Sequence, residues 1–230
     1  HGADVIVNYR ESSSDAARLC LELKNTGVRA VPIQADVTQA DQVANLISKA
    51  WDVMGCIDIL VNNVGPVVRT PFLEVPVSDF DFGMSSNVRS VYLAIQAVGK
   101  RMKSRGSGHI INIGAGSAYF RNHTVYGLAK SSLLFLTEST ALELAPEVNT
   151  NTISPGLIAD NEGMGSEFER LSIEATPMNR LVTRAEIAEM VCLLTTPAFD
   201  SVTGQNIVMD GGHSIHRIPF GHTEHPDYSK

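Results

Sequence analysis

HIINIGAGSAYFRNHTVYGLAK, residues 109–130, contains an apolar run, a glycine-containing loop and the start of a helix. The apolar run from His109 to Ile113 lacks regular polar alternation, which predicts a strand buried on both faces of its sheet. The segment from Thr124 to about Ala145 is expected to be helical. A strand, a short loop and a helix in this order favour an α/β fold with parallel strands.

Tyr126 and Lys130 stand four residues apart in the expected helix, so their side chains share one helix face. A nearby ammonium favours the phenolate, and Lys130 is therefore expected to lower the pKa of the Tyr126 phenol from about 10 toward neutral pH. Such a phenol can exchange a proton with an alcohol or carbonyl oxygen. The alternative is an unrelated pair of surface residues, because a two-residue pattern is weak evidence on its own.

The same alternation of strands and helices extends along the rest of the chain. Short apolar runs predict strands at residues 5–7, 30–34, 57–61, 109–113, 149–154 and 206–209. Helices are expected between them, including one capped by Thr38 and ended by Gly55, and a long one from about residue 77 to 105, ended by Gly106. Residues 155–176 are expected to be irregular. With no linker or repeat in the pattern, residues 1–230 are expected to form one domain with a doubly wound, Rossmann-like parallel sheet.

Composition narrows the range of partners. The 230 residues are 43% hydrophobic and 19% charged, with a formal net charge of −7. The sequence has no basic stripe of the kind that binds nucleic acid. It also has no apolar run that reaches the roughly 18 residues of a membrane span. Three scattered cysteines, Cys20, Cys56 and Cys192, predict a reducing, cytoplasmic environment rather than a disulfide framework.

Polar residues follow the first two expected strands. In open parallel sheets, ligands bind outside the carboxyl ends of the strands. Arg10 follows the first strand where no acidic residue is present to hold a ribose 2′-hydroxyl, so it would favour the 2′-phosphate of NADP over NAD. The alternative is a solvated loop arginine. Asp36 and Val37 follow the second strand and suit an adenine ring, or else Asp36 only begins the turn before Thr38.

Further candidates follow the later strands. Asn63 and Gly65 come after the third strand, where glycine lets a ligand approach the backbone closely, although a generic turn would look similar. Ser117 follows the fourth strand and could donate to a substrate oxygen beside the phenol, or merely cap its loop. Ile158 comes shortly after the fifth strand and could pack on a flat ring.

Together these residues resemble the short-chain dehydrogenase/reductases, in the layout of 3-oxoacyl-carrier-protein reductases. The likeness extends over essentially the whole chain and keeps the family's order. It rests on Asp36-Val37, Asn62-Asn63-Val64-Gly65, Asn87, the pair Tyr126 and Lys130, Pro155-Gly156, and the run from Thr203 to Gly212.

The resemblance implies a role for each matching residue. Tyr126 would be the general acid/base, and Lys130 would lower its pKa and bind the nicotinamide ribose. Asn87 would hold a water that links Lys130 to solvent. The cofactor would also be contacted by Arg10, Asp36, Val37, Asn63, Gly65 and Ile158.

The implied activity is that of an NADP(H)-dependent oxidoreductase that interconverts a small-molecule ketone and a secondary alcohol, with NAD as the other cofactor to consider. Residues from about 160 to 176 would form a lid over the substrate. The long helix and the Tyr126 helix would pair between subunits, which implies a homotetramer or homodimer.

Two departures from the family stand out. The family begins with a strand, a glycine-rich turn and a helix that cradle the pyrophosphate, and about 30 residues of this kind are expected to be missing from the chain. Ala115 occupies the usual place of the catalytic serine, so Ser117 is the favoured donor and the alternative is that the donor is absent. Both departures leave open a second function, a catalytically weak or inactive relative that acts as a binding or regulatory subunit.

Four histidines stand near the C-terminus, at spacings that can bind metal. Pro219, Gly221 and Pro226 argue against a continuous helix there. Residues 213–230 are therefore expected to form a solvated tail without a metal site. The histidines are His213, His216, His222 and His225.

Overall fold

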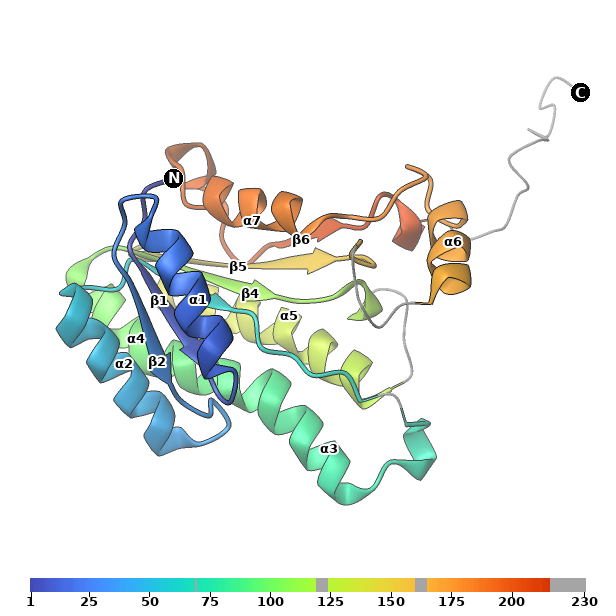
Figure 1. Cartoon of the computed structure of the whole chain (residues 1–230), viewed down its shortest axis with the longest axis horizontal. Coiled ribbons are helices and arrows are strands. Elements are labelled where there is room, and N and C mark those ends of the chain that lie inside the picture. The colour runs from blue at the N-terminus through green and yellow to red at the C-terminus, as the bar shows by residue number, and fades with distance from the viewer. Residues whose placement is uncertain (69, 119–123, 160–164, 216–230) are drawn as a thin grey trace, which may run out of the picture.

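The computed structural model describes residues 1–68, 70–118, 124–159 and 165–215. Strands and helices alternate along the chain, and every strand pair is parallel, which confirms the predicted α/β, Rossmann-like class (Figure 1). The first part comprises β1 (Val5–Tyr9), α1 (Ser13–Lys24), β2 (Ala30–Gln34) and α2 (Ala40–Met54).

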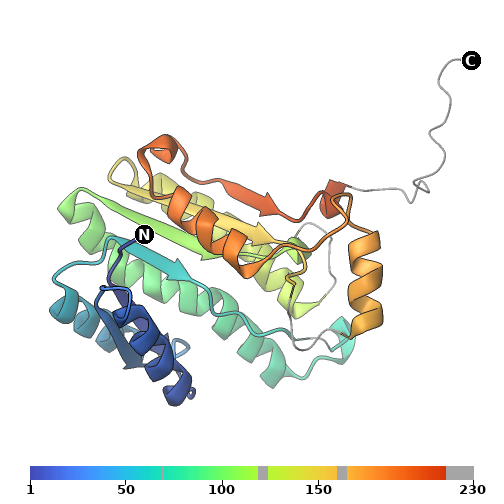
Figure 2. The ribbon, with the colours of Figure 1, turned by 45° about the horizontal axis from the view of Figure 1, so that its top comes forward.

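The second part carries the larger sheet. Its elements in chain order are β3 (Ile59–Asn62), α3 (Val77–Met84), α4 (Ser90–Arg105), β4 (Gly108–Ile113), α5 (Val125–Leu144), β5 (Val148–Pro155), α6 (Ser166–Glu174), α7 (Arg184–Leu193) and β6 (Asn206–Met209). The strands lie side by side in the order β3-β4-β5-β6. In both Figure 1 and Figure 2 their carboxyl ends point toward α6, so the loops that follow the strands gather at that edge.

Alternate side chains of β4 supply two separate hydrophobic clusters. Ile110 packs with Val98 of α4 and Leu133 of α5, whereas Ile111 faces the opposite way and packs with Leu194 at the end of α7. Because β4 is apolar on both faces, helices cover both sides of the sheet at this point. This layering holds α5, and with it Tyr126 and Lys130, against the sheet.

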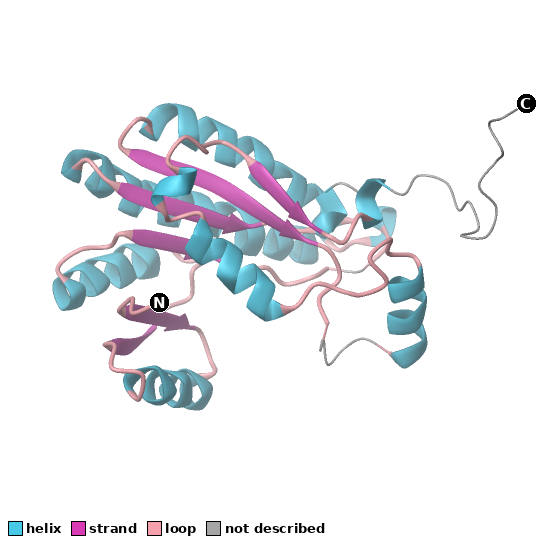
Figure 3. Cartoon of the chain, turned by 90° about the horizontal axis from the view of Figure 1, so that it is seen from above, coloured by secondary structure: helices cyan, strands magenta, loops and turns pink. Residues whose placement is uncertain are grey.

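The strands fall into two sheets rather than one. β1 and β2 form a two-stranded sheet that lies on the β3 side of the larger one (Figure 3). On β3, Ile59 is 37% exposed and Val61 is 42% exposed, which is unusual for apolar side chains in a parallel sheet. Ile33 of β2 nevertheless belongs to the same core cluster as Ile110 of β4, so α2 and α4 join the two sheets through a shared core.

Several predicted boundaries need correction. Thr38 does not cap α2, because its hydroxyl donates to Asp36 Oδ1 at 2.7 Å and Gln39 occupies the N-cap position. The long helix predicted from 77 to 105 is interrupted by a π-helical segment, Ser85–Arg89. The stretch predicted to be irregular contains α6. Gly55 and Gly106 end α2 and α4 as predicted, with φ angles of 82° and 86° that suit glycine.

No helix within the described ranges is long and apolar enough to cross a membrane.

Candidate active site

The start of α5 positions the two central side chains. Thr124 caps the helix, since its hydroxyl oxygen accepts a hydrogen bond from the Gly127 backbone N–H at 3.1 Å. Tyr126 therefore lies in the first turn and Lys130 in the next. The Lys130 Nζ atom is 5.7 Å from the centre of the Tyr126 ring, so the two side chains meet on one helix face as their spacing predicts.

Lys130 is almost completely buried, with 2% of its surface exposed. Its Nζ donates to the backbone carbonyl of Ile113 at 2.9 Å, which places the amine at the carboxyl end of β4. Burial lowers the pKa of Lys130 to about 8, because a charged ammonium is costly to remove from water. A lysine with this pKa can change its protonation state near neutral pH.

Gly65 leaves the space in which Lys130 and Asn87 meet. A Cβ atom at Gly65 would lie 2.6 Å from Lys130 Nζ and 2.8 Å from Asn87 Oδ1. Both distances are shorter than real side-chain contacts, so any other residue at this position would displace one of the two polar groups. The glycine that follows β3 is thus required for the approach of the amine and the amide.

Asn87 lies in the π-helical segment, a type of irregularity that is frequent at functional sites. Its Nδ2 donates to the backbone carbonyls of Gly83 at 3.0 Å and Pro66 at 3.1 Å. Its Oδ1 is buried and accepts no hydrogen bond from the residues that the structure describes. A buried acceptor without a donor is unfavourable, so a water or ligand N–H or O–H would be bound strongly here.

The pKa of Tyr126 shifts in the direction opposite to the one expected from the sequence. The pKa of the phenol is raised above its ordinary value of about 10, because burial disfavours the charged phenolate. Lys130 does not offset this effect, since its amine is directed to the Ile113 carbonyl and is itself easily neutralised by burial. The expectation of a lowered phenol pKa is therefore wrong for this structure.

A chain of hydrogen bonds fixes the strands beneath the site. Asn62 Nδ2 donates to Asn112 Oδ1 at 2.8 Å, and Asn112 Nδ2 donates to Thr137 Oγ1 at 2.9 Å. The hydroxyls of Thr137 and Thr152 are 2.6 Å apart. Asn62 thereby ties the end of β3 to β4. Its buried partners were missed, although Asn112 is the one polar residue within the apolar run 110–113.

Asp36 and Arg10 lie at the carboxyl ends of β2 and β1. The Asp36 Oδ1 accepts hydrogen bonds from the N–H and hydroxyl of Thr38 at 2.9 and 2.7 Å, so Asp36 stabilises the turn. The contact of Asp36 with an adenine ring stays a prediction. Burial opposes ionisation, but these bonds and the charge of Arg10 hold the pKa of Asp36 below its ordinary value. Arg10 itself is exposed and pairs with Glu11 at 2.9 Å.

The structure shows less about the other predicted site residues, which are Val37, Asn63, Ile158 and Ser117. Val37 is half-buried and packs on the core, whereas Asn63 is exposed beside the end of β3. Ile158 is half-buried and forms an isolated parallel bridge with Val182. Ser117 lies in a short 3-10 turn, Gly116–Ala118, but its side chain is outside the described part of the structure, so the choice between Ser117 and an absent donor stays a prediction.

The predicted lid and tail are only partly described. Residues 160–164 and 216–230 lie outside the described residues, and the second range includes the histidines at 216, 222 and 225. Within the lid, α6 is well-formed helix. His213 is half-buried, and its Nδ1 is 3.3 Å from Thr176 Oγ1, so the expectation of a solvated tail beginning at 213 is wrong for this residue.

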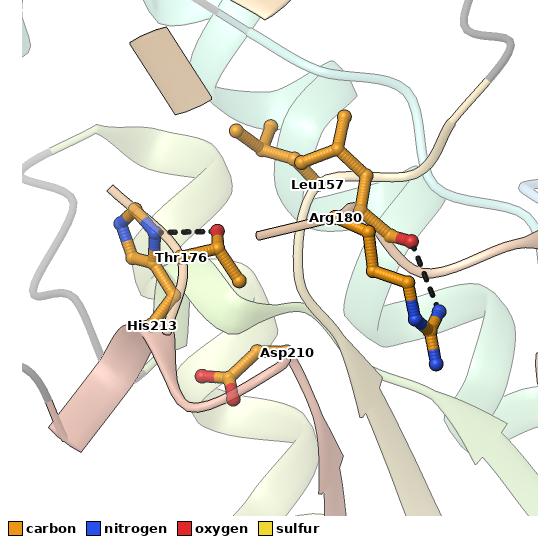
Figure 4. Close-up of a pocket in the computed structure, with 6 residues that line it drawn as sticks. Leu157, Thr176, Arg180, Asp210 and His213 are labelled. Carbon is orange, nitrogen blue, oxygen red and sulfur yellow. Dashed lines mark hydrogen bonds between the residues drawn. The ribbon is translucent and has the colours of Figure 1, made fainter. Parts of the chain in front are cut away.

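A small cavity of about 20 Å³ opens beyond the carboxyl ends of β5 and β6 (Figure 4). The Asp210 carboxylate at its base accepts hydrogen bonds from the backbone N–H groups of Gly212 at 2.9 Å and Ser214 at 2.8 Å. Tyr126 and Lys130 do not line this cavity, so it is separate from the pair that they form. Its walls are Leu157, Thr176, Arg180, Leu181, Asp210 and His213.

Comparison with known proteins agrees with this geometry. A family model described as Enoyl-(Acyl carrier protein) reductase matches residues 1–214. The chain is 34% identical to a 3-oxoacyl-[acyl-carrier-protein] reductase of Synechocystis sp. over 215 residues, which cover 92% of this chain and 87% of the relative.

Two solved structures are similar over most of their length. A blue fluorescent protein from a metagenomic library, in complex with NADPH, has a TM-score of 0.84 and 34% identity, with 92% of this chain and 88% of that one covered. A gluconate 5-dehydrogenase from Burkholderia cenocepacia, in complex with NADP and tartrate, has a TM-score of 0.86 and 29% identity, with 93% and 86% covered. The chain belongs to the short-chain dehydrogenase/reductase family and is an NAD(P)-dependent oxidoreductase.

Proposed function

We propose that this protein interconverts a ketone and a secondary alcohol with NADP(H), and that Tyr126 is its general acid/base. The observation that carries the proposal is the buried grouping around Gly65. There the Lys130 amine and the Asn87 amide oxygen approach one point, and the Tyr126 ring lies 5.7 Å from that amine. Burying an amine and an unpaired amide oxygen is costly, which favours a role in binding or catalysis over a purely structural one.

The residues present fit a dinucleotide. Gly65 lets Lys130 and Asn87 approach each other, and the Asn87 Oδ1, which has no partner among the described residues, calls for a donor. When bound, the nicotinamide supplies or accepts the hydride. Lys130 would hold the nicotinamide ribose and Ile158 the ring, while the adenosine half would lie on Asp36, Val37, Asn63 and Gly65.

NADP is the favoured cofactor. Arg10 is exposed beside Asp36, and a guanidinium there pairs well with a 2′-phosphate. Two structural relatives contain NADPH or NADP. Since Arg10 already pairs with Glu11, the phosphate would have to compete with that exposed and therefore weak ion pair.

The raised pKa of Tyr126 suits the direction of ketone reduction. A phenol that is protonated at neutral pH can give its proton to the carbonyl oxygen as the alcohol forms. Lys130, whose pKa is about 8, is mostly protonated at pH 7 and can return a proton toward the phenol. A water bound at Asn87 Oδ1 would connect this amine to solvent.

Ser117 is proposed as the hydroxyl that binds the substrate oxygen beside Tyr126. Ala115 carries no such group, and this absence supports a second candidate function. In that alternative, the protein is a catalytically weak or inactive relative that acts as a binding or regulatory subunit. Calorimetry with NADPH separates the two, because no binding at millimolar cofactor would favour the alternative.

We further propose that residues 1–230 act as one domain, with a lid that includes α6 over a small carbonyl or alcohol substrate. Assembly into a homotetramer or homodimer is supported by apolar side chains on α5 that are exposed in the single chain. Phe135 is 74% exposed, and Leu142 is 85% exposed.

The test is NADPH oxidation with a panel of 3-oxoacyl thioesters, ketosteroids and small diketones. The proposal expects turnover with at least one class, and preference for NADPH over NADH that is reduced in Arg10→Ala. Binding of NADPH without turnover of any carbonyl in the panel would contradict the proposed activity. A preference for NADH that Arg10→Ala leaves unchanged would contradict the cofactor assignment.

A further inference from the structure

The loop between β2 and α2, residues 35–39, is held by short-range hydrogen bonds. Thr38 donates twice to Asp36 Oδ1, and the Asp36 backbone N–H donates to Gln42 Oε1 at 2.8 Å. These bonds define the shape of the loop. They do not fix its position relative to Lys130, because both partners lie on the loop or at the start of α2.

Arg89 makes a connection over a much longer distance in the sequence. Its Nη1 donates to the Thr38 backbone carbonyl at 2.5 Å, across 51 residues. A charged guanidinium forms a stronger hydrogen bond to a carbonyl than a neutral donor does. The side chain is exposed, so water competes for this bond and its contribution is moderate.

The backbone of Arg89 belongs to a segment that contacts α5, the helix of Tyr126 and Lys130. Arg89 is the last residue of the π-helical segment, which contacts α5 and contains Asn87 two positions earlier. Asn87 is tied to the Gly83 and Pro66 carbonyls, and the hydroxyl of Ser90 donates to the Ser86 carbonyl at 2.6 Å. One end of the Arg89 side chain thus belongs to the Asn87 segment and the other to the Asp36 loop.

We propose that Arg89 is a positioning residue that fixes the Asp36–Thr38 loop relative to the Asn87–Lys130 site, so that one dinucleotide can occupy both. The inference rests on the proposed function, in which that loop holds the adenosine half of the cofactor. Arg89 touches neither reacting atoms nor the nicotinamide half in this account. Loss of the Arg89 side chain should therefore weaken binding of the adenosine half of the cofactor and leave binding of the nicotinamide half unchanged.

The experiment compares Arg89→Met, Arg89→Lys and the control Arg101→Met. Methionine keeps a long unbranched side chain but removes the hydrogen-bond donor. Arg101 lies on α4, which directly follows the π-helical segment, and its guanidinium lies over the Trp51 ring. Dissociation constants are measured for NADPH, for 2′,5′-ADP as the adenosine half, and for reduced nicotinamide mononucleotide as the other half. Amide hydrogen exchange at residues 36–39 is measured in the protein without cofactor.

Arg89→Met is expected to weaken the binding of NADPH and of 2′,5′-ADP by the same factor, about three- to tenfold. The binding of the mononucleotide should be unchanged. Exchange at residues 36–39 should become faster, Arg89→Lys should recover part of both effects, and Arg101→Met should show neither. Unchanged 2′,5′-ADP binding and unchanged exchange in Arg89→Met would overturn the inference. If the parent protein binds neither NADPH nor 2′,5′-ADP, the proposed function fails, and the exchange measurement still decides whether Arg89 holds the loop.

Discussion

Lys130 and Asn87 come from helical segments 43 positions apart, yet their polar ends are separated only by the space of a missing side chain at Gly65. The amine is anchored by the Ile113 carbonyl and the amide by the Gly83 and Pro66 carbonyls. Neither group can move away without losing a buried hydrogen bond. The site is therefore preorganised by β3, β4 and the π-helical segment rather than by α5 alone.

Gly65→Ala should disrupt this arrangement. The new methyl group would lie 2.6 Å from Lys130 Nζ, and the buried surroundings leave the amine little room to shift. A loss of about 1–3 kcal/mol in the free energy of unfolding is expected, as for other overpacked sites, together with weaker NADPH binding. Urea denaturation measures the loss. Gly165→Ala is the control, since a Cβ there meets no atom within 4 Å, and an equal loss in both variants would contradict the steric account.

Asn87→Ala should reduce both stability and turnover. Truncation leaves the Gly83 and Pro66 carbonyls without their side-chain donor, which is expected to cost about 1–3 kcal/mol. It also removes the amide oxygen proposed to hold a water beside Lys130, so the maximal rate should fall while NADPH binding persists. Wild-type turnover in a destabilised Asn87→Ala would show that Asn87 is structural only.

The depressed pKa of Lys130 predicts how stability changes with pH. The pKa of Lys130 is about 8 in the folded protein and near the ordinary value of 10.5 in the unfolded chain, so the unfolded chain binds more protons between these two pH values. Stability consequently rises with pH across this window, by about 2–3 kcal/mol from pH 7 to pH 10. The measurement is the free energy of unfolding of the parent minus that of Lys130→Met at each pH. A flat difference would contradict the burial of a titrating amine.

The donor beside Tyr126 can be identified by two reciprocal variants. If Ser117 binds the substrate oxygen, Ser117→Ala should lower kcat by about 10²–10³, the usual loss for one such donor. Ala115→Ser should then change kcat little. A large gain in Ala115→Ser with no loss in Ser117→Ala would show that the parent protein lacks the donor.

The sequence predicted the elements that depend on regular patterns. The helix predicted from Thr124 to about Ala145 matches α5 within one residue at each end. Gly55 and Gly106 marked helix ends because only glycine adopts their positive φ without strain. The i, i+4 spacing of Tyr126 and Lys130 likewise sufficed to bring them together, since helix geometry alone determines it.

Other features depend on contacts that no local pattern encodes. The five-residue π-helical segment is too short to change the apolar period of the helix around it. Thr38 resembles a helix cap, but Asp36 competes for its hydroxyl. The direction of the Tyr126 pKa shift could not be predicted, because it depends on how deeply the phenol is buried and on the carbonyl to which Lys130 points.

The central claim is that the Tyr126 hydroxyl handles the proton that accompanies hydride transfer. It is tested most directly by the turnover of Tyr126→Phe with NADPH and a carbonyl that the parent reduces, with Tyr92→Phe, an exposed tyrosine on α4, as the control. The account predicts that Tyr126→Phe folds and binds NADPH but loses turnover by at least about 10²-fold, while Tyr92→Phe keeps it. Turnover by a folded Tyr126→Phe at the rate of the parent protein would contradict it.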